Sequence, residues 1–525
     1  MKGLIQLLFI TLPLFIVAQV QPAPDRGPNE GEGPFDRMVI RGANLIDGTG
    51  APAFGPVDII IEGNRIKEVV LVGTPHVPIN SEDRPAKGTK EIDANGAYVL
   101  PGFINIHSHV DGGPKAPEAE YAYKLWLGHG ITTIRGVPAG EVNWVENEKK
   151  RSAANKIVAP RIVNFQVPGS GKEWKGGPLL TPEKTREWVA WANSKGVEGI
   201  KIFNLDPEIM AAAIDESRKL KMGSVAHLSQ LMVGRVNARE ASEMGLHNLT
   251  HFYGLFESLY KDEDIQHWPR DLEYNDEQDR FSQVAHQWDK IHPRGSDEWN
   301  ELIDFFLEKD FILDPTMTAY LAGRDVMKAR NADWMEPYVL PSLHDFYEPN
   351  RLDHGSYFYN WTTWEEVAWK NFYRVWMSFL NDYKNAGGRV TVSDDASFIY
   401  NLFGVGVIEE MELLQEAGFH PLEVIRGATL HAAEAIFEPK GKPIEFGIVR
   451  PGLLADLIII EENPIENLKV LYGTGFPRLN DETGKVERVG GVKYTIKDGI
   501  VYDAKQLLRD VEDMVKKQRE ERGEK

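Results

Sequence analysis

Cysteine is absent from all 525 residues of the chain. Its absence excludes disulfide bonds, a thiolate nucleophile, zinc sites built on cysteine and a lipid-modified cysteine near the amino terminus. A metal site in this chain is therefore limited to histidine, carboxylate or modified lysine ligands. Stability must come from a large core, and a chain of this length can bury one.

Positive charge is also scarce. The chain holds 59 lysines and arginines against 79 aspartates and glutamates, which gives a net charge of −20. Nucleic acid needs a basic face to receive its phosphates, so we expect no nucleic-acid partner. The remaining composition is that of a globular protein, and the length predicts two or three units or one large barrel with additions.

Long apolar runs are missing except at the amino terminus, where one extends from Leu4 to Ala18 behind Lys2. A stretch rich in proline, glycine and acidic residues follows it. This pattern is typical of a secretory signal peptide at residues 1–18, cut after Ala18, and predicts a periplasmic or secreted protein. An uncleaved anchor is the alternative, but the run is shorter than the roughly 20 residues of a membrane span. We expect no span in the mature chain.

Strand-like alternation marks both flanks of the remaining chain. Short apolar segments separated by Gly, Asp and Asn turns occur in residues 37–72 and again in 457–502. We predict that residues 37–100 and 441–505 build one small composite β-sandwich. A flexible linker is expected at 19–36, and a charged, solvated helix at 506–525.

The centre of the chain, residues 101–440, alternates strands with helices. Eight strands are predicted, at 103–107, 132–135, 161–165, 199–203, 224–227, 249–252, 311–315 and 389–393. Eight such units close a parallel barrel whose active site lies at the carboxyl ends of the strands. Two tryptophan-rich inserts, about 253–300 and 320–385, interrupt the pattern. We expect their aromatic side chains to pack helical caps, with a lid over the barrel mouth as the alternative.

His107 and His109 end the first predicted barrel strand. Residues two apart on a strand point to the same side, so both imidazoles aim at one point. Two convergent imidazoles are what a catalytic divalent metal ion needs. For this motif alone, a chance pair of surface histidines is an equal alternative.

Further candidate ligands fall at the ends of later strands. They are Lys201 on the fourth strand, His227 on the fifth, His251 on the sixth and Asp394 after the eighth. Each has an ordinary structural explanation when taken singly, and His247 competes with His251. Asp395, next to Asp394, either binds a substrate amine or caps a helix. Together, the strand-end residues predict one shared site.

The order of these residues resembles the amidohydrolase superfamily. The resemblance covers most of the chain and is carried by residues 46–50, 100–109, 130–135, 428–434 and 447–459. The last segments are similar to the branch that holds imidazolonepropionase-like enzymes and Xaa-Pro dipeptidases. The resemblance implies an α/β fold, a TIM-like (β/α)8 metal-dependent hydrolase barrel beside the composite β-sandwich.

The resemblance also implies two divalent metal ions, zinc by default. One ion would take His107, His109 and Asp394, the other would take His227 and His251, and a carboxylated Lys201 would bridge them. Carboxylation converts a cation that repels metals into an anionic bidentate ligand. The implied reaction cleaves a C–N bond of an amide, dipeptide or cyclic amide by attack of a metal-bridging hydroxide, with Asp394 as the proton carrier.

Other functions stay open from the sequence. The same bimetal site suits a lactonase or phosphotriester hydrolase, and a non-catalytic exported binding or scaffold protein is a more distant alternative. A dipeptidase needs a cation for the carboxylate of its small-molecule substrate, and Lys172, Lys175 and Arg235 are the candidates. Gly136, where many relatives carry Asp, departs from the family pattern. The sequence leaves the substrate and any homo-oligomer open.

Overall fold

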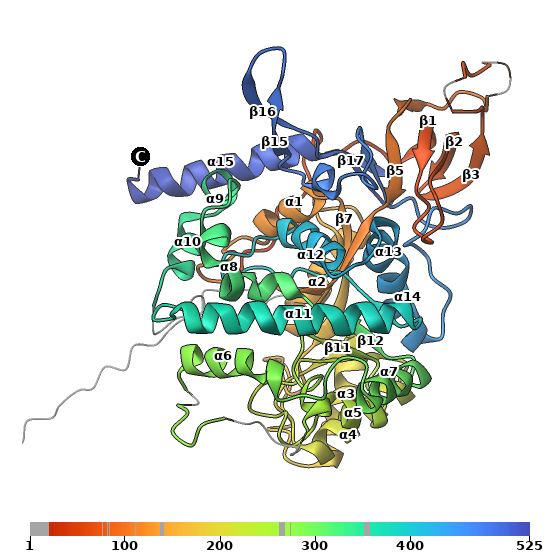
Figure 1. Cartoon of the computed structure of the whole chain (residues 1–525). Helices are drawn as coiled ribbons and strands as arrows, with labels where there is room; N and C mark the ends of the chain where they lie inside the picture. Colours follow the sequence, from red (N-terminus) through yellow and green to blue (C-terminus); the bar gives the residue numbers. More distant parts are fainter. Residues whose placement is uncertain are drawn as a thin grey trace, which may run out of the picture.

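The computed structural model describes residues 20–75, 77–80, 82, 84–110, 112–136, 141–261, 268–273, 275–350 and 358–524 (Figure 1). The predicted signal peptide at 1–18 lies outside the described residues. In the described part of the chain, no helix is long and apolar enough to cross a membrane.

A parallel sheet of eight strands forms the centre of the molecule. The strands are β6 (Phe103–Ser108), β7 (Ile131–Gly136), β8 (Arg161–Gln166), β9 (Gly199–Ile202), β10 (Gly223–Ala226), β11 (Asn248–Thr250), β12 (Ile312–Asp314) and β13 (Arg389–Val390). They pair in sequence order from β6 to β13. The backbone after β13 returns to β6, where the Asp395 amide donates to the His107 carbonyl at 3.2 Å. The predicted TIM-like (β/α)8 fold is confirmed.

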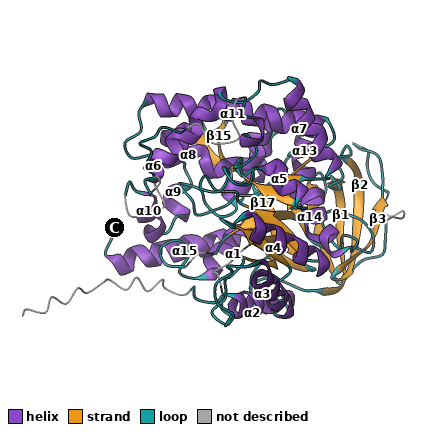
Figure 2. Ribbon diagram, turned by 90° about the horizontal axis from the view of Figure 1, so that it is seen from below, coloured by secondary structure: helices purple, strands orange, loops and turns teal. Residues whose placement is uncertain are grey.

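Helices surround this sheet, as Figure 2 shows from below. They are α1 (Ala119–Gly128), α2 (Val142–Ala153), α3 (Pro182–Ser194), α4 (Pro207–Lys219), α5 (Ala238–Glu243), α7 (Asp297–Glu308), α12 (Val405–Glu416), α13 (Pro421–Arg426) and α14 (Ala432–Phe437). Proline opens α3 and α4 at the first turn, where its missing N–H leaves no hydrogen bond unmade. The strands between these helices are buried along most of their length, as expected for a parallel sheet covered by helices.

Both flanks of the chain contribute to a second eight-stranded sheet. The first flank supplies β1 (Phe35–Leu45), β2 (Phe54–Gly63), β3 (Arg65–Leu71), β4 (Lys90–Asp93) and β5 (Tyr98–Pro101), and the second supplies β14 (Leu457–Ile460), β17 (Val492–Lys497) and β18 (Ile500–Asp503). Strand β5 pairs with β1 on one side and with β14 on the other, which joins the two flanks. A hairpin of β15 (Phe476–Asn480) and β16 (Lys485–Val489) projects at the top of Figure 1.

Residues 20–34, predicted to belong to a flexible linker, lie against the barrel. Gln21 pairs by backbone hydrogen bonds with Pro117 and Ala119, at 2.8 and 3.0 Å. The amide of Ala23 donates to the carboxylate of Glu148 at 3.2 Å. The proline- and glycine-rich composition therefore reflects an irregular strap whose polar backbone groups find partners on the barrel.

The two inserts are largely helical. The first holds α6 (Glu277–Ala285), and the second holds α8 (Leu321–Arg330), α9 (Met335–Tyr338), α10 (Pro341–Tyr347) and α11 (Thr363–Asn385). Helix α11 starts with a capping box between Thr362 and Glu365. Its Trp369 and Trp376 are fully buried and pack edge-on against Phe252 of the barrel. Packing is thus the role of these tryptophans, as expected.

The last helix, α15 (Ala504–Arg522), packs on α1 instead of standing in solvent as predicted. Its buried residues Leu507, Leu508, Val511 and Val515 recur at helical spacing and form one apolar face. Asp510 on this helix pairs with Lys124 of α1 at 2.9 Å. The high overall charge of the segment concealed that narrow apolar face.

Lys497 of β17 ties the second sheet to helix α2 of the barrel and supports a prediction on pH. Its Nζ donates to the Ser152 carbonyl at 2.6 Å and to Asn155 Oδ1 at 2.9 Å, and burial lowers its pKa to about 7. In the unfolded chain the pKa is about 10.4. Between these values the unfolded chain binds more protons, so this group makes stability rise with pH.

Replacing Lys497 by methionine is therefore expected to flatten the rise of the unfolding free energy between pH 7 and pH 9 by on the order of 2 kcal/mol. Denaturant titrations of the wild type and the variant at both pH values measure the difference. An unchanged pH dependence would mean that Lys497 stays protonated in the folded protein.

Candidate metal centre

The two histidines of the first barrel strand converge as predicted. His107 is the fifth residue of β6, and His109 follows the strand end. Their Nε2 atoms lie 3.1 Å apart. His107 is 3% exposed, and burial lowers its pKa well below the ordinary value, so it is neutral near pH 7.

Lys201 on β9 reaches the same point from the fourth strand. Its Nζ lies 3.1 Å from His107 Nε2 and 3.0 Å from Thr250 Oγ1. The side chain is buried, and burial lowers the pKa of Lys201 to about 7. The structure therefore brings the predicted lysine into contact with the histidine pair.

His251 follows β11 and completes the cluster from the sixth strand. Its ring centroid lies 4.9 Å from that of His107, and its Nδ1 lies 2.5 Å from Thr316 Oγ1. The Thr316 hydroxyl also lies 2.7 Å from the Pro315 carbonyl, to which it donates. Nδ1–H of His251 is then the donor to Thr316, which leaves the Nε2 lone pair facing the cluster.

His227, after β10, lies beside His251 with ring centroids 4.7 Å apart. It also packs against the rings of Phe203 and Tyr253, at 5.0 and 4.8 Å. The competing histidine, His247, lies elsewhere, with its Nε2 3.8 Å from the carboxylate of Glu438. The choice of His251 over His247 therefore agrees with the geometry.

The carboxylate that joins the histidines is Asp395, not Asp394. Its Oδ1 lies 3.2 Å from the Nε2 atoms of both His107 and His109, and its Oδ2 lies 3.6 Å from His251 Nε2. Burial raises the pKa of Asp395, but the charge of His107 when it is protonated and the hydrogen bond from His109 lower it well below its usual range. Asp395 has a φ of +45°, a left-handed conformation that turns its side chain toward the cluster.

Asp394 points away from the histidines, which corrects its predicted placement. Its two oxygens accept hydrogen bonds from four donors: Asn105 Nδ2 at 2.6 Å, Trp126 Nε1 at 3.0 Å, the Gly404 amide at 3.0 Å and the Ala396 amide at 3.3 Å. Burial raises the pKa of Asp394 to about 6. The left-handed backbone at Asp395 separates the directions of the two neighbouring side chains, so Asp395 faces the histidines and Asp394 faces its buried donors.

The donor set fits a divalent metal ion. His107, His109 and Asp395 offer ligand atoms that all lie within 4.8 Å of one another. His107 Nε2, His109 Nε2 and Asp395 Oδ1 lie within 3.2 Å of one another, and a cation could be held by all three when both imidazoles offer their Nε2 lone pairs. Imidazole with carboxylate suits zinc, manganese or iron.

A cavity of about 290 Å³ opens on the cluster. Aromatic rings from the barrel and from both inserts form part of its walls: Phe203, Tyr253, Phe281, Tyr320 and Phe398. Two cationic side chains, Lys115 and Arg280, also line it. None of the tryptophans of the inserts lines this cavity, whereas Phe281 of α6 does. The first insert thus contributes to the pocket as well as to packing.

The cations predicted to receive a substrate carboxylate do not line this cavity. Lys172 is 74% exposed and pairs with Glu141, and Arg235 is 57% exposed and pairs with Asp206. Lys175 donates to the Lys172 carbonyl at 2.8 Å. Arg280 was not among the cations predicted from the sequence. Its helix has the usual amphipathic pattern of a surface helix, and only tertiary packing brings Arg280 to the pocket.

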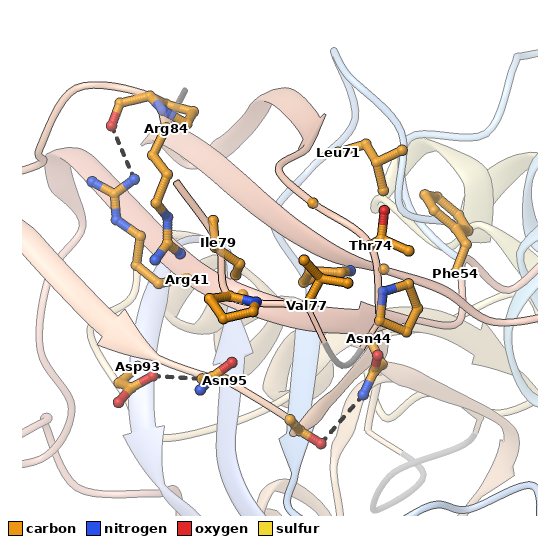
Figure 3. A pocket seen from close by; sticks show the side chains of 18 of the residues that line it. Arg41, Asn44, Phe54, Leu71, Thr74, Val77, Ile79, Arg84, Asp93 and Asn95 are labelled. Carbon is orange, nitrogen blue, oxygen red and sulfur yellow. Dashed lines mark hydrogen bonds between the residues drawn. The ribbon is translucent and has the colours of Figure 1, made fainter. Parts of the chain in front are cut away.

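A larger cavity, about 1590 Å³, lies at the second eight-stranded sheet, beside β1, β2 and the segment that follows β3 (Figure 3). It shares no lining residue with the histidine pocket. Its arginines are already paired, since Arg41 and Arg84 both contact the buried carboxylate of Asp58, at 2.8 and 2.6 Å. Because these arginines are paired and its described lining residues include no cluster of metal-binding side chains, this cavity is a poorer catalytic candidate.

No family model matches the chain, and curated relatives match it in part. An adenine deaminase from Methanoculleus marisnigri is 50% identical over 52 residues, 10% of either chain. A dihydroorotase from Bacillus thuringiensis is 25% identical over 208 residues, 39% of this chain and 48% of the relative. The matched segments thus span less than half the length of these curated relatives.

Solved structures match over almost the whole chain. A bottromycin amidohydrolase has a TM-score of 0.58 at 17% identity, covering 91% of both chains. A Xaa-Pro dipeptidase with bound methionine has a TM-score of 0.55 at 17% identity, over 89% of this chain and 100% of that one. An ochratoxinase from A. niger has a TM-score of 0.54 at 15% identity, over 89% and 96%. These likenesses establish the fold and confirm the predicted resemblance.

Proposed function

We propose that this chain, which has the amidohydrolase fold, is a metal-dependent hydrolase of a C–N bond in a small amide or dipeptide. One observation carries the proposal. Side chains from the ends of several barrel strands meet in one cluster beside the pocket: His107, His109, Lys201, His251 and Asp395. Such convergence at the carboxyl ends of the strands is where barrel enzymes place their chemistry.

The metal would sit among His107, His109 and Asp395, with His227 and His251 beside it. When bound, divalent ions lower the pKa of water and polarise a carbonyl group. Asp395 would accept the proton of the attacking water and pass it to the leaving nitrogen, a role that the predicted scheme gave to Asp394. The aromatic rings lower the polarity around the buried cluster, which strengthens the electrostatic interactions there.

Carboxylation of Lys201 is part of the proposal. The Nζ atom is buried and lies 3.1 Å from the neutral His107 ring. Placed there, a carbamate would add an anionic bidentate ligand to a cluster that otherwise holds one carboxylate. Intact-protein mass before and after acid treatment, with Lys201→Arg as the control, tests for a labile 44-Da group, about the mass of CO2.

Metal analysis of protein purified without chelators, paired with a hydrolysis screen, tests the function. The screen covers Xaa-Pro and other dipeptides, cyclic amides, lactones and phosphotriesters. We expect one or two divalent ions per chain and turnover of an amide that is lost with a chelator and restored by zinc or manganese. Turnover of lactones or phosphotriesters alone would replace the proposal, and a metal-free, inactive protein would contradict it.

Arg280 is proposed to receive an acidic group of the substrate. It lines the pocket, and its side chain is 14% exposed. Glu277 pairs with its terminal nitrogen at 2.9 Å, while its Nε has no hydrogen-bond partner within the described part of the chain. Replacing Arg280 by glutamine is expected to raise KM for carboxylate-bearing substrates roughly 10- to 100-fold, with kcat little changed.

The matched control for Arg280 is Lys172→Gln, which removes an exposed cation away from the pocket. Kinetics on a dipeptide and on its carboxyl-terminal amide separate the two effects, since the amide lacks the charge that Arg280 would bind. An equal loss on both substrates would contradict a carboxylate-binding role.

Export is proposed from the sequence of residues 1–18. Fractionation of cells that express the full chain, followed by amino-terminal sequencing, tests it. A mature protein that starts at Gln19 outside the cytoplasm is expected, and a cytoplasmic protein that retains Met1 would contradict it.

A further inference from the structure

Two buried polar atoms face each other below the cluster without forming a hydrogen bond. They are His107 Nδ1 and Asp314 Oδ2, 4.0 Å apart. Neither atom has a hydrogen-bond partner among the described residues, and the two side chains are 3% and 0% exposed. Buried polar atoms are nearly always satisfied in folded proteins, so a matched donor and acceptor left this close call for an explanation.

The orientation of the Asp314 carboxylate is fixed by its other oxygen. Oδ1 accepts hydrogen bonds from the hydroxyls of Thr391 and Ser393, both at 2.8 Å. The backbone is held as well, because the His251 amide donates to the Asp314 carbonyl at 3.0 Å. Oδ2 is therefore directed at His107 by bonds that do not involve His107.

The opposite side of the imidazole explains what Asp314 does. His107 Nε2 lies in the cluster, 3.2 Å from Asp395 Oδ1. To offer a lone pair there, a neutral imidazole must carry its proton on Nδ1. A carboxylate that accepts the Nδ1–H fixes this tautomer, holds the ring and makes Nε2 a stronger ligand.

We infer that Asp314 is a positioning residue that orients His107 and sets its tautomer for metal binding. The inference rests on the proposed function for the metal, but not on any particular substrate. The competing explanation is that Asp314 serves only to tie β12 to the segment after β13 through Thr391 and Ser393. In the first explanation the functional atom of Asp314 is Oδ2, which faces His107. In the second it is Oδ1, which binds Thr391 and Ser393.

Three variants decide between them. Asp314→Asn removes the charged partner of Nδ1 at nearly constant shape, Asp314→Ala removes both oxygens, and Thr391→Val removes one hydroxyl from Oδ1 and leaves Oδ2 unchanged. Competition with a chromophoric chelator measures Zn²⁺ affinity. We expect a 10- to 100-fold loss in both Asp314 variants and less than about threefold in Thr391→Val. Thermal unfolding of the metal-free proteins checks that each variant is folded.

A second readout needs no metal. Nitrogen-15 NMR of the metal-free, histidine-labelled protein, with His107→Gln to assign the signal, is expected to show His107 protonated on Nδ1 in the wild type. In Asp314→Ala it is expected to show a mixture of tautomers. Unchanged zinc affinity and tautomer in the Asp314 variants, or an equal loss in Thr391→Val, would overturn the inference. A wild type that binds no zinc would instead contradict the proposed function, and the tautomer would still test Asp314.

Discussion

Replacing Asp395 by alanine is expected to lower kcat/KM by about a thousandfold or more and to remove most of the bound metal. The carboxylate contacts three imidazoles, with Oδ1 3.2 Å from His107 and His109 and Oδ2 3.6 Å from His251. Without it, the buried cluster loses the one carboxylate that contacts three of its imidazoles, and only the proposed carbamate on Lys201 would remain to balance a divalent charge. The loss of a general base alone accounts for about 10²- to 10⁴-fold.

Asp395→Asn separates the two contributions, because the amide keeps the shape and removes the charge. Metal content by elemental analysis and steady-state kinetics are measured for both variants, and Asp206→Ala, which removes a 61% exposed carboxylate, is the matched control. Retention of metal and of activity within tenfold of the wild type would mean that Asp395 is neither ligand nor base.

The barrel and most of the cluster could be predicted because both depend on local patterns. Each predicted strand is a short apolar run between turn signals, and a parallel barrel gathers the ends of all its strands at one rim. A prediction of the strand ends that is correct within about two residues is therefore enough to bring four of the ligand candidates together: His107, His109, Lys201 and His251.

The choice between Asp394 and Asp395 was beyond such patterns. Strand β13 ends at Val390, four residues before Asp394, and the chain then leaves the regular alternation. The left-handed turn at Asp395 sends that side chain into the site, whereas the buried donors of Trp126 and Gly404 hold Asp394. Those donors come from elements distant in sequence, and no periodicity in the sequence reveals them.

The pocket above the cluster was unpredictable for a similar reason. Arg280 and Phe281 lie on α6, a helix of an insert whose sequence says which face is apolar but not what that face covers. The amphipathic pattern fixes one rotation of the helix and leaves its docking to tertiary contacts. A family resemblance gives no help here, because inserts are where relatives differ.

Replacing Asp394 by alanine is expected to lower the free energy of unfolding by about 3 kcal/mol or more in the metal-free protein. The change leaves the side-chain donors of Asn105 and Trp126 and the amides of Gly404 and Ala396 without their acceptor, in a place with no access to water. Each unsatisfied buried donor costs roughly 1–3 kcal/mol, less whatever relaxation recovers.

Unfolding of the chelator-treated protein, followed by tryptophan fluorescence, measures the loss, and Asp304→Ala on the exposed face of α7 is the control. The comparison with Asp395→Ala is the sharper test, because one variant is expected to lose stability and the other to lose metal binding. Asp394→Ala should lose stability before metal is added, while Asp395→Ala should stay folded and lose metal. A stable Asp394→Ala that binds no zinc would return Asp394 to the metal site and reverse the assignment of the two aspartates.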